Sequence, residues 1–154
     1  MRRTDRERDA NFAWTVIDQA AYSVLAMVDR EGEPYCIPIS PARIGETLYF
    51  HSAKSGQKID ELLNHDKVCL TATSKMEPVP GKFTIEFASA VVKGRAKIVT
   101  DEGEQIEALR VICQRYTPDN MADFERAISK SLHRTEVIRI DVEEITGKEK
   151  KVGT

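Results

Sequence analysis

The sequence of 154 residues has no apolar run of membrane-spanning length, no low-complexity tract and almost no net charge. Its 23 basic and 25 acidic side chains leave a net charge of −2, which gives no indication of a nucleic-acid or membrane surface. Two arginines stand near the N-terminus without an apolar segment after them, so we predict no signal peptide. With 41% hydrophobic and 31% charged residues, the chain is long enough for one domain with a sizeable core.

Cysteine is scarce, and spacings typical of metal sites are missing. The three cysteines, Cys36, Cys69 and Cys113, are odd in number and far apart, which argues against a disulfide framework. No CxxC, HxxxH or HExxH pattern exists, so we predict no metal site. Because Cys36 and Cys69 lie in apolar contexts, we expect reduced, buried thiols in a cytoplasmic protein rather than catalytic nucleophiles.

The first part of the chain predicts a helix followed by a β-hairpin. Thr4 and Glu7 have the spacing of a capping box, and apolar residues at helical spacing continue to about Gln19. Two extended apolar runs follow, at residues 22–28 and 35–42, with turn residues between them. This arrangement is typical of two antiparallel strands.

Two prolines make the second of these strands unusual. Pro38 and Pro41 cannot donate hydrogen bonds to a neighbouring strand, so the strand lies at an edge, contains a bulge, or turns its backbone groups toward a ligand. The last possibility makes residues 37–40 a candidate ligand contact. A plain edge strand is at least as well supported by the residues alone.

Further extended segments are predicted at residues 47–50, 67–73, 83–100 and 136–145. The segment 83–100 is longer than a typical strand, so we expect a bend or a bulge within it. Between them, residues 74–82 contain two prolines and a glycine and form a loop long enough to act as a lid.

Two helices are predicted between the last two extended segments. Thr100 caps the first, which ends near Tyr116, and the second carries apolar residues at helical spacing. The lysine-rich tail from Gly147 is expected to be loose. Several short antiparallel strands with a few added helices indicate a small β-barrel of the α+β class.

The stretch from Leu48 to Leu63, LYFHSAKSGQKIDELL, carries the clearest local signal for a ligand. A strand passes through small residues into a short helix, and Lys54 and Lys58 flank the helix start, where the positive end of the helix dipole disfavours cations. A bound phosphate would offset this mismatch, because helix N-termini, hydroxyls and a lysine are typical phosphate ligands. A solvated turn with two exposed lysines is the simpler alternative.

His51 lies at the end of the strand, next to this loop. A histidine here could stack on a planar ligand or transfer a proton near neutral pH. It could equally be half-buried and bonded to a backbone carbonyl. His65 and His133, by contrast, are expected at the surface.

Three segments carry a resemblance to known proteins: YFHSAKSGQKID from Tyr49, SVLAMVDREGEPYCIPIS from Ser23 and FASAVVKGRAKIV from Phe87. Together they resemble the pyridoxamine 5′-phosphate oxidase-like family of FMN-binding split barrels. Within the family, the chain is most similar to the nitroimidazole-resistance (Nim-like) branch. The resemblance implies a six- to seven-stranded antiparallel Greek-key split barrel with flanking helices over residues 1–148, and a flexible tail over 149–154. It also implies a homodimer with one FMN in each of two clefts between the subunits.

The resemblance further implies which residues contact the flavin. The phosphate would lie at Ser52, Ala53 and Lys58, and the ring edge would contact mainly backbone groups of residues 37–40. His51 would pack near the ribityl chain or the ring as the candidate catalytic residue, and Ser89, near the dimer cleft, and Arg134 are further candidates. The full set of predicted FMN-binding residues is Ile37, Pro38, Ile39, Ser40, His51, Ser52, Ala53, Lys58 and Ser89.

The implied activity is FMN-dependent reduction of nitroaromatic or other small electron-accepting compounds. The chain ends in ITGKEKKVGT, without the Arg and His that pyridoxamine phosphate oxidase proper uses for its substrate, so vitamin B6 oxidation is not implied. Two alternatives stay open: a non-catalytic dimer of the same fold that binds flavin or haem, and a structural dimer with an empty cleft.

Overall fold

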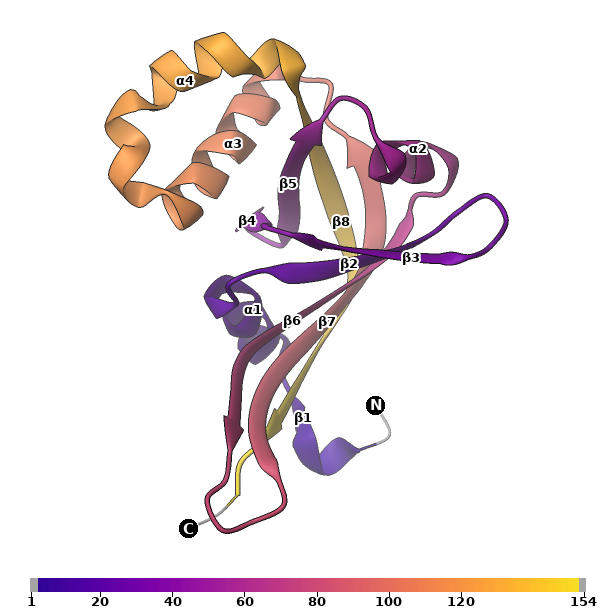
Figure 1. Ribbon diagram of the computed structural model, residues 1–154, viewed down its shortest axis with the longest axis vertical. Helices are drawn as coiled ribbons and strands as arrows, with labels where there is room; N and C mark the ends of the chain where they lie inside the picture. Colours follow the sequence, from indigo (N-terminus) through magenta and orange to yellow (C-terminus); the bar gives the residue numbers. More distant parts are fainter. Residues whose placement is uncertain (1–2, 153–154) are drawn as a thin grey trace.

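A computed structural model describes residues 3–152, in which four α-helices accompany eight antiparallel strands (Figure 1). The strands are β1 (Glu7–Arg8), β2 (Ser23–Val28), β3 (Pro34–Ile39), β4 (Ala42–Ile44), β5 (Thr47–Ala53), β6 (Lys67–Pro78), β7 (Ile85–Ile98) and β8 (Thr135–Lys150). The α-helices are α1 (Ala10–Gln19), α2 (Gln57–Asn64), α3 (Glu102–Tyr116) and α4 (Phe124–Ser131), with short 3₁₀ turns η1 (Thr4–Arg6), η2 (Pro118–Asp123) and η3 (Leu132–Arg134). The predicted α+β split barrel with flanking helices is confirmed, with eight strands instead of six or seven.

The sheet curls until its two edges approach each other. Its strand order is β3-β2-β6-β7-β8-β5-β4, and β1 pairs with β8. The strands at the two ends of this order, β3 and β4, are consecutive in the chain, and only Ser40 and Pro41 separate them. Three Cα steps span at most about 11 Å, so the two edges must come close at this corner. Within residues 3–152 no strand pairing joins them, and the barrel is therefore split.

Strands β6, β7 and β8 continue beyond the body of the barrel as a narrow stalk (Figure 1). β6 pairs with β7 from Lys67↔Arg95 to Pro78↔Ile85. The predicted lid loop over residues 74–82 is therefore wrong in its first half, because residues 74–78 belong to β6 and only the hairpin tip remains as a loop. Cross-strand pairing with β7, which local sequence does not encode, lengthens the strand.

The long segment β7 is one strand, and the bulge lies in its partner β8 rather than within β7 as predicted. Lys93 is opposite Glu144 and Gly94 is opposite Val142, which leaves Glu143 of β8 as the extra residue. A Cβ atom on Gly94 would clash with the carbonyl oxygen of Asp141, so the bulge depends on glycine at this position.

Both ends of the chain differ from the sequence-based expectation. The capping box at Thr4 and Glu7 is wrong: Asp9 caps α1 by accepting a hydrogen bond from the Phe12 amide at 2.8 Å. The tail from Gly147 is not loose, since β8 continues to Lys150. β1 pairs with the end of β8 at Glu7↔Lys148, so the two terminal segments hold each other.

Two apolar clusters stabilise the molecule. The first fills the barrel between the sheet and α1, and its fully buried members include Leu25, Phe50 and Ile138. The second lies between α3, α4 and the outer face of β5 and β8, around Leu109, Phe124 and Val137. The pair α3 and α4 thus forms an arm that packs on one face of the sheet (Figure 1).

The cysteines are free thiols, but not all are buried as expected. Cys69 and Cys113 are half-buried, whereas Cys36 is exposed because it lies on the face of β3 opposite to Tyr35 and Ile37, which pack against the first cluster. Between residues 3 and 152, no group of three or more potential metal ligands converges. None of the helices in that range has the length and apolar character needed to cross a bilayer.

Candidate functional site

Alternation along β5 points His51 away from the barrel core. Leu48 and Phe50 enter the first cluster, whereas Tyr49 packs in the second cluster against the α3–α4 arm. Side chains two residues apart on a strand share a face, so His51 lies on the same side as Tyr49. Loss of hydration, followed by the positive charge of Lys58, lowers the pKa of His51 below its ordinary value of 6.5. The imidazole, although exposed at the surface, is therefore neutral at pH 7.

The turn from β5 into α2 is open and positively charged. Gly56 is the N-cap residue of α2 with φ 135°, and no side chain caps the first turn. A Cβ atom on Gly56 would meet nothing within 4 Å, so the space directly beside this glycine is open. Neither Lys54 nor Lys58 forms an ion pair within the described part of the chain. We call the turn from Ser52 to Lys58 the phosphate corner.

Of the three possibilities that the prolines left open for β3, the edge strand is confirmed, because β3 is the terminal strand of the sheet order. Its partner is β2, with Pro38 opposite Val24, and its other edge has no strand partner among the described residues. Ile39 is buried and Pro38 is exposed. β4 follows at once and pairs Ala42 with Tyr49 of β5, so the end of β3 approaches the end of β5 that carries His51.

Of the nine predicted residues, Ser89 alone lies far from His51 and the phosphate corner within one chain. The amide of Val99 bonds to the carbonyl of Val137, which is opposite His51 in the sheet, whereas Ser89 is opposite Lys148 in the stalk. About ten residues of strand separate Ser89 from Val99, which is roughly 30 Å. Ser89 is closer to the end of β3, because Ile39 is opposite Ser23, Ser23 is opposite Ala72, and Ala72 is opposite Ala90, the neighbour of Ser89. These three strand spacings amount to roughly 15 Å.

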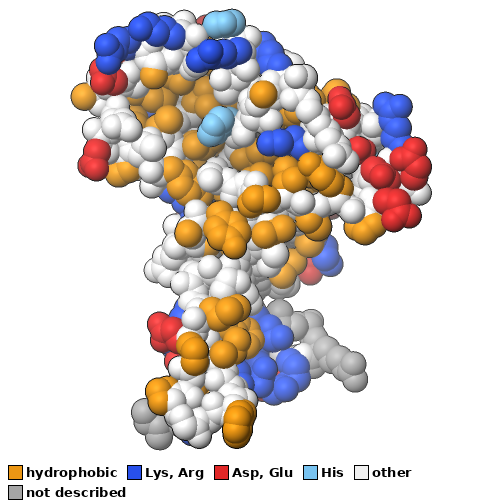
Figure 2. Space-filling model, viewed as in Figure 1, with side chains coloured by type: hydrophobic (Ala, Val, Ile, Leu, Met, Phe, Trp, Pro, Cys, Tyr) orange, Lys and Arg blue, Asp and Glu red, His pale blue; other side chains and the backbone are white. Residues whose placement is uncertain are grey.

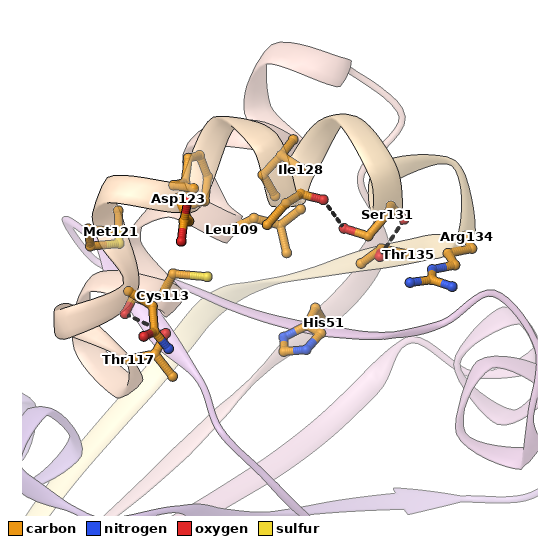
Figure 3. A pocket seen from close by; sticks show the side chains of 13 residues that line it. His51, Leu109, Cys113, Thr117, Met121, Asp123, Ile128, Ser131, Arg134 and Thr135 are labelled. Atoms are coloured by element: carbon orange, nitrogen blue, oxygen red, sulfur yellow. Dashed lines mark hydrogen bonds between the residues drawn. The ribbon is translucent and has the colours of Figure 1, made fainter.

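A cavity of about 530 Å³ lies between His51 and the α3–α4 arm (Figure 3). Its lining comes from β5, α3, η2, α4, η3 and the start of β8. The lining residues are His51, Leu109, Cys113, Thr117, Asn120, Met121, Asp123, Phe124, Ala127, Ile128, Ser131, Arg134 and Thr135. Sequence reasoning found His51 and named Arg134, but it assigned Met121, Phe124 and Ile128 only to a helix face. Apolar residues at helical spacing look the same whether they face a core or a cavity.

Two charged side chains line this cavity, and only one of them has an ion-pair partner. Asp123 forms an ion pair with Arg126 at 2.8 Å, so its charge is already compensated. Arg134, at the opposite end of the cavity, is exposed and forms no ion pair among the described residues (Figure 3). His51 lies on the floor and is neutral at pH 7. The cavity therefore has one uncompensated positive charge.

Arg115 of α3 ties the arm to the barrel. Its guanidinium donates hydrogen bonds to the carbonyls of Ile17 at 2.5 Å, Ala20 at 2.9 Å and Pro41 at 2.8 Å. The hydroxyl of Tyr116 donates a second bond to the Pro41 carbonyl at 2.9 Å. The Ile17 and Ala20 carbonyls lie at the C-terminal end of α1, where they have no partner within the helix. One side chain thus fixes α1, α3 and the β3–β4 connection together.

A second polar group holds α3 against β5 and β8. The Tyr49 hydroxyl donates to Glu104 at 2.9 Å, and Arg139 donates to the same carboxylate oxygen at 3.1 Å. Burial, followed by the hydrogen bond to Glu104, raises the pKa of Tyr49 to about 12. Hydrogen bonds therefore hold both ends of α3 in place. This favours a preformed cavity over one that forms only when a ligand binds.

Comparison with known proteins gives a family and a set of related structures. The sequence profile described as pyridoxamine 5′-phosphate oxidase matches residues 9–149. A candidate 5-nitroimidazole antibiotic resistance protein from Bacteroides thetaiotaomicron is 28% identical, with a TM-score of 0.78 over 92% of this chain and 84% of that chain. This similarity confirms the predicted resemblance to the nitroimidazole-resistance branch. A comparison with curated protein sequences finds no match.

Two more distant structures share the fold. The flavocytochrome Anf3 from Azotobacter vinelandii is 22% identical, with a TM-score of 0.77 over 99% of this chain and 72% of that chain. An FAD and heme binding protein from Mycobacterium smegmatis is 16% identical, with a TM-score of 0.81 over 96% of this chain and 74% of that chain. At these identities the similarity extends to the split barrel and not to particular side chains.

Proposed function

Because the chain belongs to the pyridoxamine 5′-phosphate oxidase family, we propose that it is an FMN-dependent oxidoreductase that reduces nitroaromatic or other small electron-accepting compounds. The family and the similar structures support flavin binding in general. The choice of FMN, the reductase activity and the individual contacts are the proposal.

The phosphate corner is the observation that carries this proposal. An uncapped helix start presents amide groups without helical partners, and the dipole makes that end positive. Lys58 adds an ammonium group in the first turn, and Ser52 adds a hydroxyl at the end of β5. A phosphate dianion bound here would accept hydrogen bonds from the amides, the hydroxyl and the ammonium group. Without it, the charge of Lys58 is unfavourable beside the positive end of the helix dipole and disfavours protonation of His51.

The flavin ring would then extend from the corner toward the end of β3. The free edge of β3 and the connection at Ser40 offer backbone groups that are not used by a strand partner in the described range. His51 would lie between the ring and the cavity, within reach of a bound substrate. Bound FMN would supply hydride and electron transfer, and this chain would bind and orient it, exclude water and hold a neutral imidazole beside it.

A homodimer would complete this site. Ser89 lies roughly 30 Å along the strand from His51 and the phosphate corner, and we propose that it contributes to a partner's cleft. The stalk also exposes Met76 and Ile85, with 66% and 39% of their surface accessible, and Phe83 is fully exposed at its tip. Hydrophobic side chains gather along this stalk in Figure 2. We propose that a second copy of the chain covers them.

Titration with FMN, followed by flavin fluorescence, tests the proposal. We expect the wild-type chain to bind FMN, and Lys58→Ala to weaken binding by about 10- to 150-fold, the equivalent of losing a charge-assisted hydrogen bond. Lys82→Ala is the matched control, because Lys82 lies at the tip of the stalk. A folded protein that takes up no FMN would instead support a structural dimer with an empty cleft. Flavin binding without any reduction by NADH or NADPH would support a non-catalytic flavoprotein.

Haem is a second candidate ligand, and His51 is the observation that favours it. A neutral imidazole is the form that binds haem iron, and His51 is the one histidine among the residues that line the cavity. The similar flavocytochrome and the FAD and heme binding protein combine both kinds of cofactor in this fold. A Soret band that appears on adding haemin, and that is lost in His51→Ala, would support this candidate.

A further inference from the structure

We propose that the cavity beneath the α3–α4 arm binds the electron acceptor, and that this acceptor is an aromatic compound with one carboxylate group. The inference rests on the proposed function, because it takes the flavin to lie on the opposite side of His51. It goes further by naming the charge and shape of the substrate.

The body of the cavity suits a flat apolar ring. Leu109, Phe124 and Ile128 are buried members of the second apolar cluster and line the cavity directly. Met121 and Cys113 add sulfur atoms, whose polarisable surfaces pack well against aromatic rings. A volume of about 530 Å³ lies within the ordinary range for small-molecule sites and exceeds what a single five-membered ring needs. An aromatic ring with a substituent of several atoms fills it better.

The proposed charge of the substrate follows from a difference in charge between the two ends of the cavity. At one end Asp123 is compensated by Arg126, and its neighbours Thr117 and Asn120 are neutral. At the other end the guanidinium of Arg134 has no acidic partner in residues 3–152, and Ser131 and Thr135 beside it are neutral as well. A neutral or cationic ligand would leave this guanidinium uncompensated, whereas a carboxylate matches its planar fork in a bidentate pair.

The position of Arg134 determines the orientation in which such a ligand would bind. Arg134 ends η3, directly before β8, and Thr135 pairs with Ala53 at the end of β5. His51 is two residues before Ala53 and lies on the cavity floor (Figure 3). A ligand whose carboxylate contacts Arg134 would therefore place its ring over the His51 imidazole, with its far end toward Met121 and Cys113.

The test compares two ligands of nearly equal shape on the FMN-loaded protein. We expect 4-nitrobenzoate to bind about tenfold more tightly than 4-nitrobenzyl alcohol, measured by calorimetry without added reductant. In Arg134→Gln this preference should disappear, with alcohol binding unchanged. Lys130→Gln is the matched control, since Lys130 is an exposed cation on α4 that does not line the cavity. Equal affinity for the two ligands in the wild-type protein would overturn the proposal.

A second pair of variants tests the location. Ala127 lines the cavity, and Ala127→Trp should reduce binding of both ligands at least tenfold while leaving FMN bound. Ala122→Trp, at an exposed position outside the lining, should bind both ligands normally. Undiminished binding in Ala127→Trp would overturn the proposed location.

The FMN content of each variant, read from its visible absorbance, separates this inference from the proposed function. If the wild-type chain takes up no FMN, the proposed function fails. If FMN binds but Arg134→Gln weakens FMN itself, Arg134 belongs to the flavin site and the substrate assignment fails alone. A haem spectrum that depends on His51 would assign the cavity to haem and also overturn the proposal.

Discussion

The phosphate corner and the cavity beneath the arm meet at His51, yet they are built in opposite ways. The corner is one continuous segment, in which a strand, a turn and the first residues of α2 provide every feature. The cavity combines the end of β5 with residues from 109 to 135, which fold onto the sheet as a separate arm. The corner therefore depends on local backbone conformation, and the cavity depends on the contacts that hold the arm in place.

The largest expected effect is on the arm side. Arg115→Ala removes the donor for three carbonyls and should lower the free energy of unfolding by roughly 2 to 4 kcal/mol. Hydrogen exchange should become faster in α3 and α4 while α2 keeps its protection. Arg126→Ala removes an exposed ion pair with Asp123. It should lower the free energy of unfolding by less than about 1 kcal/mol. Equal losses in the two variants would show that Arg115 does not hold the arm.

A smaller effect is expected on the corner side. Gly56 has φ 135°, a conformation that side chains rarely adopt, so Gly56→Ala should destabilise the protein by about 1 to 2 kcal/mol. Steric overlap with neighbouring atoms is not the cause, since a Cβ atom at this position has no neighbour within 4 Å. Binding of FMN should weaken while binding in the arm cavity is retained. Ser55→Ala serves as the comparison, and a similar loss in both would rule out backbone conformation as the cause.

The smallest effect concerns His51, where the two regions meet. The folded protein disfavours the protonated imidazole, so its pKa lies below the unfolded value near 6.5. The contribution of His51 to stability is therefore full above that pH and is lost as pH falls through the folded pKa. In flavin-free protein, NMR titration should give a pKa below 6.5, and Lys58→Ala should raise it only partly, because loss of hydration is the larger cause. A pKa above 6.5 would contradict this description.

The same contrast explains how much the sequence could predict. The phosphate corner could be predicted because its evidence lies in one short segment. That segment contains small residues after the strand, Gly56, and two lysines at the start of a helix. Pro38 likewise limited β3 to an edge, a bulge or a ligand contact, because it lacks an amide donor, and the sheet order shows that β3 is an edge strand. The predicted number of strands is one or two too low for two reasons. β1 has only two residues and exists through its pairing with the end of β8, and β4 begins at Ala42, where the sequence shows only the end of the extended run over 35–42.

The cavity could not be predicted in the same way. Met121, Phe124 and Ile128 follow a helical period, and that period does not reveal whether a sheet, a helix or empty space lies opposite. Arg115 carries no signal at all until the fold brings the carbonyls of Ile17, Ala20 and Pro41 around it. Ser89 lies where the stalk begins, and its predicted role concerns a cleft between two copies of the chain, which a single chain does not contain.

The visible spectrum of the purified protein, with identification of any chromophore released by heating, tests the central proposal most directly. Bands near those of free flavin, with FMN released at about one equivalent per chain and lost in Lys58→Ala but not in Lys82→Ala, are the predicted result. A colourless protein that stays colourless after incubation with FMN would contradict it.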